Sequence, residues 1–406
     1  MTTVSTHRAF VTGCGMVSPL GCDVDTFWQG LVAGTAAIGP IGGFDTTGLT
    51  PALAAEARGF AADRWLSAEE IERLDRAGQF ALSAARAALD DAQLHLDGTD
   101  PSRVGVIVGT TLGAMAIGER YLRARHEGAA FDARQLLHMP YTALSTRLAR
   151  ALGVRGPVLS PSIACASGTQ AVGLALELIR CGRGDVFVVG GVEALCHFVV
   201  AGFNCLRATT ASAVRPFDAR RDGLAVGEGA AILIAESEAH ARGRGAMCDI
   251  EVAGCGLSSD AVHMTAPARD GAGAARAMRS ALETADVAPH DVAFISAHGT
   301  GTVYNDAMEM VAIAAVFGEA APHIPTNSIK GAIGHTLAAA GAFEAIVCAR
   351  VLRDGCIPPT AGCEQLDAAC GLDIVRGEAR RRRVDVALST SSAFAGNNAA
   401  VVMRRS

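Results

Sequence analysis

Lysine is almost absent from this chain of 406 residues: Lys and Arg together number 35, and Lys330 is the single lysine. A chain with this bias uses Arg at ordinary surface positions. The ammonium group of Lys is compact and fits beside an imidazole or a buried carboxylate, whereas the guanidinium of Arg is a wide planar fork. We therefore predict that Lys330 occupies a confined position in which Arg does not fit, with Glu344, in the same helical segment, as its counter-charge. Retention by chance is the alternative.

Aromatic residues are also scarce, at 5% of the chain, so the core must be built mainly from Ala, Val, Leu and Ile, which suits an α/β architecture. No apolar run reaches the roughly 18 residues that a membrane-spanning helix needs. The first residues, MTTVSTHRAFVTG, lack the basic-then-apolar order of a signal peptide. We expect a soluble cytoplasmic protein that does not enter a membrane.

Basic residues form no extended stripe and the net charge is −6, so nothing suggests nucleic-acid binding. Arg380 to Arg383 form the one dense basic run, which is either a solvated loop before the final strand or a docking point for an acidic partner. The 12 cysteines show neither C-x-x-C pairs nor combined Cys/His ligand spacing. We expect reduced cysteines, all but one of them without chemistry, and neither a metal nor a redox cofactor.

Apolar runs that end in Gly or Thr, at residues 103–111 and 185–191, predict strands buried on both faces, and 230–237 and 292–302 are further candidates. From Ser67, a capping box with Glu70 and apolar residues at helical spacing predict one amphipathic helix. Gly13-x-Gly15 invites a dinucleotide-binding interpretation. Ser18 and the Pro that follows it stand where the required helix should open, which disfavours that interpretation.

The chain also repeats itself loosely. The strand GVIVGTT is followed by SIACASGTQAVGLALELIRCG, and later AFISAHGT is followed by SIKGAIGHTLAAAGAFEAIVCARVL. Strands that alternate with Ala-rich helical stretches imply sheets between helical layers. We predict two similar halves, residues 1–246 and 247–406, joined by a connector at 242–247.

Three side chains could carry chemistry. Cys165, in ACASG, stands at the start of a nearly uncharged helix, where free N–H groups and the helix dipole favour the thiolate; a structural cysteine is equally compatible with this stretch. His298 follows a strand in a Gly/Thr loop, and His335 precedes a helix of small residues. Zinc binding by the two histidines lacks a third ligand at a helpful spacing. Two neutral imidazoles could instead donate N–H bonds to one developing oxyanion.

Taken together, these segments resemble the β-ketoacyl-ACP synthases of the decarboxylating Cys-His-His type, which elongate fatty acids or assemble type II polyketides. The likeness covers nearly the whole chain, and its most specific motifs are ACASG, RPFDARRDGLAVGEGAAIL, AHGTGT, SIKGAIGHTLAAAG and SAFAGNNAAVVM. The resemblance implies a thiolase-like fold of two duplicated βαβαβαββ halves in an α-β-α-β-α arrangement. It also implies that Cys165 accepts an acyl chain from acyl carrier protein as a thioester.

The resemblance implies roles for the other residues too. His298 and His335 would stabilise the enolate formed when malonyl-ACP loses carbon dioxide, with Lys330 and Glu344 as the charged pair that organises them. The backbone N–H groups of Cys165 and Phe394 would hold the oxyanion, and the Phe394 ring would gate the two half-reactions. The hydroxyls of Thr300 and Thr302 would lie near the phosphopantetheine arm.

Several positions depart from the family pattern. The Gly-Phe-Gly-Gly gate is Ala-Phe-Ala-Gly at 393–396, the expected Pro after Thr302 is Val303, followed by Tyr304, and Gly331 replaces a usual Ser. The expected acyl-pocket loop, GTTLGAM, carries Leu112 and Met115, and LLHMPYTALS differs from the usual segment. These departures favour a specialised polyketide or polyene ketosynthase over the housekeeping fatty acid enzyme.

Two other classes are disfavoured. A chain-length-factor-like subunit would lack the cysteine nucleophile, and a degradative thiolase would carry a second reactive cysteine near the C-terminus. The expected partner is an acidic acyl carrier protein with phosphopantetheine-bound acyl and malonyl groups, and the assembly is a homodimer or a heterodimer with a chain-length-factor-like subunit. Candidate docking residues are Arg73, Arg76, Arg123, Arg125 and Arg380 to Arg383.

Overall fold

The computed structural model describes residues 7–406, and 11 of its strands form one large sheet that is continuous through a short junction. On one side of the junction lie β1 (Ala9–Val17), β8 (Gly229–Ser237), β6 (Val186–Glu193), β4 (Val104–Gly109) and β5 (Val158–Leu159). On the other side lie β9 (Ile250–Ser259), β16 (Asn397–Arg405), β15 (Val386–Ser392), β10 (Phe294–Ser296), β11 (Pro325–Asn327) and β13 (Asp373–Ile374). Only β1 and β9 join the two sides, through the pairs Ala9↔Val252 and Phe10↔Glu251.

The two sides of the sheet have the same topology. Outward from the junction, β1–β8 and β8–β6 are antiparallel, whereas β6–β4 and β4–β5 are parallel. On the second side, β9–β16 and β16–β15 are antiparallel, and β15–β10 and β10–β11 are parallel. This correspondence confirms the duplication predicted from the sequence repeat, with β13 added at one edge. The division at residue 246 stays a prediction.

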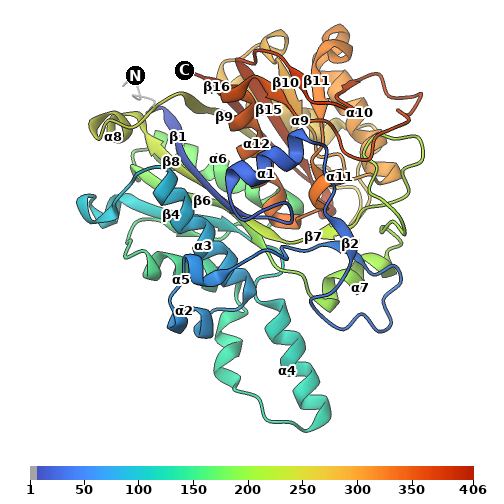
Figure 1. The fold of residues 1–406 in the computed structure, drawn as a ribbon. Coiled ribbons are helices and arrows are strands. Elements are labelled where there is room, and N and C mark those ends of the chain that lie inside the picture. Colours follow the sequence, from blue (N-terminus) through green and yellow to red (C-terminus); the bar gives the residue numbers. More distant parts are fainter. Residues whose placement is uncertain (1–6) are drawn as a thin grey trace.

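Helices cover both halves and also fill the space between them (Figure 1). In the first half, α3 (Arg76–Asp91) and α5 (Tyr141–Ala151) pack on the outer face. In the second half, α9 (Ala272–Ala285) and α10 (Val303–Phe317) do the same. A third core, between the two halves, is built around α6 (Ser167–Arg180) and α12 (Ala340–Asp354). The order of layers is therefore α-β-α-β-α, as expected.

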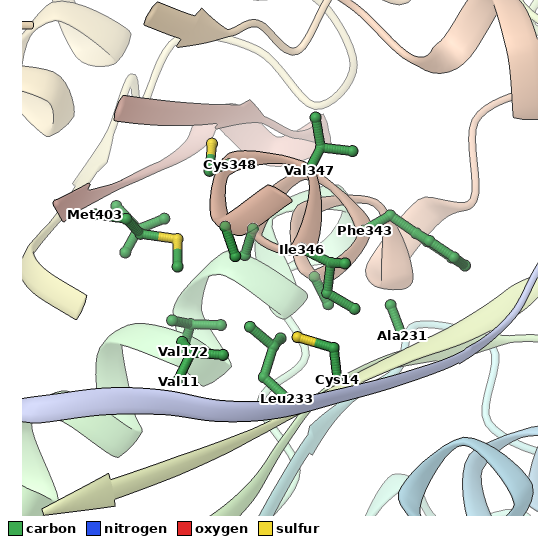
Figure 2. Packing of buried hydrophobic residues seen from close by; sticks show 14 of the residues in the cluster. Val11, Cys14, Val172, Ala231, Leu233, Phe343, Ile346, Val347, Cys348 and Met403 are labelled. Atoms are coloured by element: carbon green, nitrogen blue, oxygen red, sulfur yellow. The ribbon is translucent and has the colours of Figure 1, made fainter. Parts of the chain in front are cut away.

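The central layer is packed closely because its residues are small. Figure 2 shows Ile346 of α12 facing Cys14 of β1 and Leu233 of β8, with Val347 on the opposite side of the helix. A Cβ atom on Gly341 of α12 would lie 1.9 Å from Oγ1 of Thr169 on α6. Only glycine permits this approach. Gly341 therefore allows the starts of α6 and α12 to lie side by side.

Two expectations about helices are wrong. The helix expected from Ser67 is two helices, α2 (Ala68–Arg73) and α3, although the capping box of Ser67 and Glu70 is present. Asp75 starts α3 anew by accepting a hydrogen bond from the Gly78 N–H group, which turns the chain between the two helices. Lys330 and Glu344 lie on different helices, because α11 (Lys330–Ile333) ends at Gly334, whose φ is 66°.

The remaining elements lie around this framework. They are α1 (Val24–Val32), α4 (Met115–Glu127), α7 (His197–Cys205), α8 (Glu238–Gly243), β2 (Ile38–Pro40), β3 (Leu53–Ala55), β7 (Val226–Gly227), β12 (Cys356–Ile357) and β14 (Arg380–Arg381). The connector expected at 242–247 begins inside α8. The strand expected at 292–302 ends at Ser296 and continues as a loop. Between residues 7 and 406, no helix is long and apolar enough to cross a membrane.

Candidate active site

Cys165 stands in a tight turn at the start of α6. The preceding residue, Ala164, has φ 52°, a left-handed conformation that a non-glycine residue rarely adopts. A short 3₁₀ turn (Ala164–Ala166) leads from there into the helix. The Cys165 side chain is buried, and the backbone N–H groups of Cys165 and Phe394 face its sulfur. This geometry agrees with the predicted placement of the thiol at a helix start.

His335 touches the thiol and has a defined tautomer. Its Nε2 lies 3.0 Å from Sγ of Cys165. Its Nδ1 accepts a hydrogen bond from the Leu337 N–H group at 3.3 Å, so in the neutral ring the proton resides on Nε2. His335 therefore presents an N–H donor to the reaction centre.

His298 reaches the same tautomer by a different route. The ammonium of Lys330, which can only donate, lies 3.3 Å from its Nδ1, so the neutral ring of His298 also carries its proton on Nε2. The two imidazole rings lie 5.2 Å apart, centroid to centroid, at an angle of 84°. Both histidines line the same cavity as Cys165. The Nε2–H group of His335 faces the Cys165 sulfur.

Lys330 forms an ion pair with Glu344, and both side chains are almost completely buried, with 1% and 0% exposed. Glu344 also accepts a hydrogen bond at 3.4 Å from the Ser391 hydroxyl, which lies 2.7 Å from the Thr169 hydroxyl. The space around α11 is tight, because a Cβ atom on Gly331 would lie 1.9 Å from a backbone oxygen. The predicted confined position of the lone lysine and its predicted counter-charge are both present in the structure.

Burial sets the protonation states of the centre. It lowers the pKa of His298 and of His335 well below the usual value, and the Lys330 charge lowers both further. Burial also raises the pKa of the Cys165 thiol to about 12, although Lys330 and the Phe394 N–H group oppose this shift. The expectation of a low-pKa thiolate is therefore not met for this buried thiol, because desolvation exceeds the stabilisation that the helix start provides. The resting centre holds a neutral thiol and two neutral imidazoles.

Two buried acidic residues of α10, which sequence reasoning missed, hold the loop that carries His298. Glu309 accepts hydrogen bonds from the N–H groups of His298, at 2.6 Å, and Gly299, at 2.7 Å. Asp306 accepts one from the Thr300 N–H group at 3.0 Å. The signal in the sequence was the presence of two carboxylates within the nearly apolar stretch DAMEMVAIAAVF.

The centre opens into a cavity of about 310 Å³. Thr300 and Thr302 line it, with their hydroxyl oxygens 2.9 Å apart. Phe394 also lines it, with its ring centroid 5.6 Å from that of Phe203. The remaining lining residues are Leu206, Arg207, Ala208, Asp222, Gly223, Leu224, Thr265, Ala266, Pro267, Val303, Tyr304, Asn305, Ser392 and Ala393.

Leu112 is not among the residues that line this cavity. It is buried in an apolar cluster that shares Phe203 and Leu224 with the cavity lining, and the Phe394 side chain packs against this cluster. The loop of Leu112 is held by Glu193, a fully buried carboxylate that accepts hydrogen bonds from the N–H groups of Thr111 and Leu112. Burial raises the pKa of Glu193 to about 8. Sequence reasoning missed Glu193.

The segment that carries Phe394 is closed over the thiol. Ala395 has φ 62°, a left-handed conformation, and its N–H group donates to the Met264 carbonyl at 2.7 Å. The Gly396 carbonyl accepts a hydrogen bond of 2.7 Å from the Asp260 N–H group. The Phe394 segment is therefore hydrogen-bonded to the 260–267 loop at Ala395 and at Gly396.

Half of the eight arginines suggested for docking pair with acidic residues. Arg76 pairs with buried Glu228, Arg73 with Glu69, Arg380 with Asp373 and Arg383 with Asp385. Arg123 and Arg125 lie on α4, which projects from the body of the molecule (Figure 1). None of the candidate arginines lines the cavity.

Comparison with known proteins gives a consistent result. Residues 7–241 match the sequence model of the β-ketoacyl synthase N-terminal domain, and residues 250–364 match that of the C-terminal domain. A 3-oxoacyl-[acyl-carrier-protein] synthase 2 of Staphylococcus aureus (strain N315) is 37% identical, over 98% of each chain.

Solved structures of ketosynthases are similar to this chain over nearly its whole length. The ishigamide ketosynthase/chain length factor superposes with a TM-score of 0.94 at 40% identity, covering 98% of this chain and 99% of the other. A ketosynthase in complex with its type II PKS acyl-carrier protein superposes with a TM-score of 0.91 at 32% identity, covering 98% of this chain and 99% of the other. With the duplicated sheet and the Cys-His-His centre, these matches show that the chain belongs to the β-ketoacyl synthase family and has its thiolase-like fold.

Proposed function

We propose that this enzyme is a 3-oxoacyl-acyl-carrier-protein synthase that joins malonyl-ACP to a Cys165-bound acyl chain with loss of carbon dioxide. One observation carries the proposal: a thiol and two neutral imidazoles, each with its proton on Nε2, face one cavity. This set combines a nucleophile with two donors for a developing oxyanion. The roles below are those that this geometry supports.

In the first half-reaction, Cys165 takes the acyl chain. Its sulfur attacks the acyl thioester carbonyl of the carrier-bound donor, and the oxyanion of the tetrahedral intermediate accepts hydrogen bonds from the backbone N–H groups of Cys165 and Phe394. The bond to the pantetheine sulfur breaks, and the proton of the Cys165 thiol ends on that leaving sulfur. The Nε2–H group of His335, 3.0 Å from Sγ, stabilises the sulfur while it carries negative charge.

In the second half-reaction, the carboxylate of malonyl-ACP leaves as carbon dioxide. The electron pair of the broken C–C bond passes into the thioester carbonyl, whose enolate oxygen accepts N–H bonds from His298 and His335. The enolate carbon then attacks the acyl-Cys165 carbonyl, and the C–S bond breaks. The Cys165 thiolate takes one proton from solvent, so the products are the β-ketoacyl-ACP, carbon dioxide and free enzyme.

Lys330 acts by positioning. Its ammonium fixes the tautomer of His298, and Glu344 compensates its charge. We expect the Thr300 and Thr302 hydroxyls, which line the cavity, to hydrogen-bond the amides of the phosphopantetheine arm.

We further propose a cytoplasmic enzyme of a type II polyketide or polyene pathway, acting as a homodimer or beside a chain-length-factor-like subunit. The support is the similarity to the ishigamide and type II PKS ketosynthases, together with the Ala395 and Tyr304 departures. Housekeeping fatty acid elongation is the second candidate, favoured by the 37% identity to the Staphylococcus enzyme. A non-catalytic subunit is disfavoured because Cys165 and both histidines are assembled. Leu112 is expected to affect chain length through the cluster behind Phe394.

Intact-protein mass after incubation with a panel of acyl-ACP thioesters tests the proposal. We expect a gain of one acyl group in the wild type and none in Cys165→Ala. Preference for long or unsaturated donors would favour the specialised pathway, and preference for short saturated donors the housekeeping one. Failure of every donor to load wild-type enzyme, alone and with added chain-length-factor-like protein, would refute the assignment.

A further inference from the structure

The mouth of the cavity carries two arginines that have no ion-pair partner within residues 7–406. These residues are Arg207, which lines the cavity, and Arg269, whose guanidinium lies 5.7 Å from the ring centroid of the lining residue Tyr304. We propose that Arg207 and Arg269 bind the phosphodiester that attaches the pantetheine arm to the carrier protein. This inference rests on the proposed function and names the part of the substrate that the mouth recognises.

Arg207 is held at the mouth by its backbone. It follows α7 in a left-handed conformation, with φ 52°, and its N–H group donates to the Asn204 carbonyl at 2.9 Å. The next N–H group, that of Ala208, donates to the Phe203 carbonyl at 3.1 Å. The backbone is therefore fixed while the exposed side chain makes no hydrogen bond to the described part of the chain. A long cation on a fixed backbone is free to meet a ligand from outside.

Arg269 is held by an aromatic ring instead of an acid. Tyr304, in the first turn of α10, lines the mouth and is 63% exposed. The loop that carries Arg269 is fixed by Asp260, which accepts a hydrogen bond of 2.9 Å from the Ala268 N–H group. Stacking on a ring orients a guanidinium but leaves its hydrogen-bond donors unused. In this chain Tyr304 thus does what a carboxylate does for most other arginines, without neutralising the charge.

The chemistry of the carrier-bound substrate indicates which group the two arginines bind. A carrier-bound acyl group can reach Cys165 only if the pantetheine arm passes through the mouth, and the arm ends outside at a phosphodiester. Arginine binds phosphate oxygens through charge-assisted, often bidentate hydrogen bonds. Asp222 also lines the mouth and would repel a broad acidic protein face. Two arginines and one aspartate form a small site with a net positive charge. Such a site suits a compact phosphate better than an extended acidic helix.

The experiment compares two small donors that differ only in this phosphate: an acyl-pantetheine and the corresponding acyl-4′-phosphopantetheine. The second-order rate of Cys165 acylation is followed by intact mass for wild type, Arg207→Gln, Arg269→Gln and the double variant. Arg183→Gln, an exposed arginine in the turn before β6 without an ion pair, is the matched control.

We expect wild type and Arg183→Gln to prefer the phosphorylated donor by roughly tenfold, the size of one charge-assisted contact. The preference should fall to a few-fold in each single variant and vanish in the double variant. Tyr304→Leu, which removes the ring under Arg269, should lower the preference less than Arg269→Gln does. Raising the salt concentration should lower it in wild type.

Three results would overturn the inference. The first is a preference that survives in the double variant, and the second is equal rates for the two donors in wild type. The third is a loss confined to acyl-ACP, which would assign the arginines to the protein face of the carrier. If wild type were acylated by neither small donor nor by acyl-ACP, the proposed function itself would fail, a result distinct from loss of the donor preference alone.

Discussion

Replacement of Lys330 by Met tests the centre most directly, because it removes one charge of a buried pair and nearly preserves the side-chain volume. Glu344 would keep only the long hydrogen bond from the Ser391 hydroxyl, 3.4 Å, as compensation for its charge. Breaking a buried ion pair by removing one partner costs about 3–5 kcal/mol, because an uncompensated charge stays buried. Both side chains are at most 1% exposed, so solvent cannot screen the remaining carboxylate.

The cost depends on pH in a defined direction. Burial already raises the pKa of Glu344, and the Lys330 charge is the main influence that lowers it. Without Lys330 the pKa of Glu344 rises further, so the folded state binds more protons than the unfolded state above the usual glutamate pKa of about 4.3. Stability must then fall as pH rises from that value to the raised pKa. The deficit of Lys330→Met should therefore be larger at pH 8 than at pH 5.5.

Urea unfolding at both pH values, at one protein concentration, measures the effect. The control is Lys330→Met/Glu344→Gln, which removes both charges and should recover most of the lost stability. It should not recover condensation activity, because His298 would still lack the ammonium that fixes its tautomer. A double variant as unstable as the single one would refute the explanation based on an uncompensated charge, as would a loss in Lys330→Met below about 1 kcal/mol.

Three further outcomes are expected. Ala395→Gly should raise the free energy of unfolding by about 1 kcal/mol, because Ala395 has φ 62°; an unchanged or lower urea midpoint would contradict the strain. Glu193→Gln should lower that free energy by about 1–3 kcal/mol, because its amide keeps one acceptor oxygen for Thr111 but turns an N–H₂ group toward the Leu112 N–H group. Acyl loading should then show a changed chain-length preference; a loss under about 0.5 kcal/mol would contradict this. Alkylation of the Cys165 peptide by iodoacetamide, followed by mass spectrometry, should rise about tenfold per pH unit from pH 7 to 9, because the thiol pKa is about 12; a plateau in that range would show a lower pKa.

The buried strands were predictable from the sequence because the apolar runs that indicate them are local and recur along the chain. Continuous apolar runs such as 104–109 and 186–193 read as strands buried on both faces, and they are. The break between α2 and α3 was not predictable from periodicity. Leu74 and Gly78 keep the apolar spacing in phase across it, and the change depends on one side chain, Asp75, which caps the second helix. A cap that leaves the periodicity unchanged is invisible to a pattern of apolar residues.

Within the site, residue type and position at element ends pointed to Cys165, His298 and His335, whereas protonation states could not be inferred. The helix start at Cys165 suggested a thiolate, but burial by segments far apart in the chain raises the pKa to about 12. Glu193 was missed for a related reason. Its donors come from the loop of Thr111 and Leu112, 81 to 82 residues away in the sequence. A lone glutamate at a strand end is ordinarily a surface residue until the tertiary structure shows what it accepts.

The duplication itself explains how the Cys165 thiol and the His335 imidazole meet. Cys165 lies between β5 and α6 in the first half, and His335 lies between β11 and α12 in the second, so they occupy corresponding positions of the repeat. The two central helices start side by side because Gly341 admits Thr169. Each half therefore contributes one loop at a helix start, and the packing brings Sγ and Nε2 to 3.0 Å. Larger residues at the start of either helix would separate the two groups without altering Cys165 or His335, so the small residues of the central layer hold the thiol and the imidazole in contact.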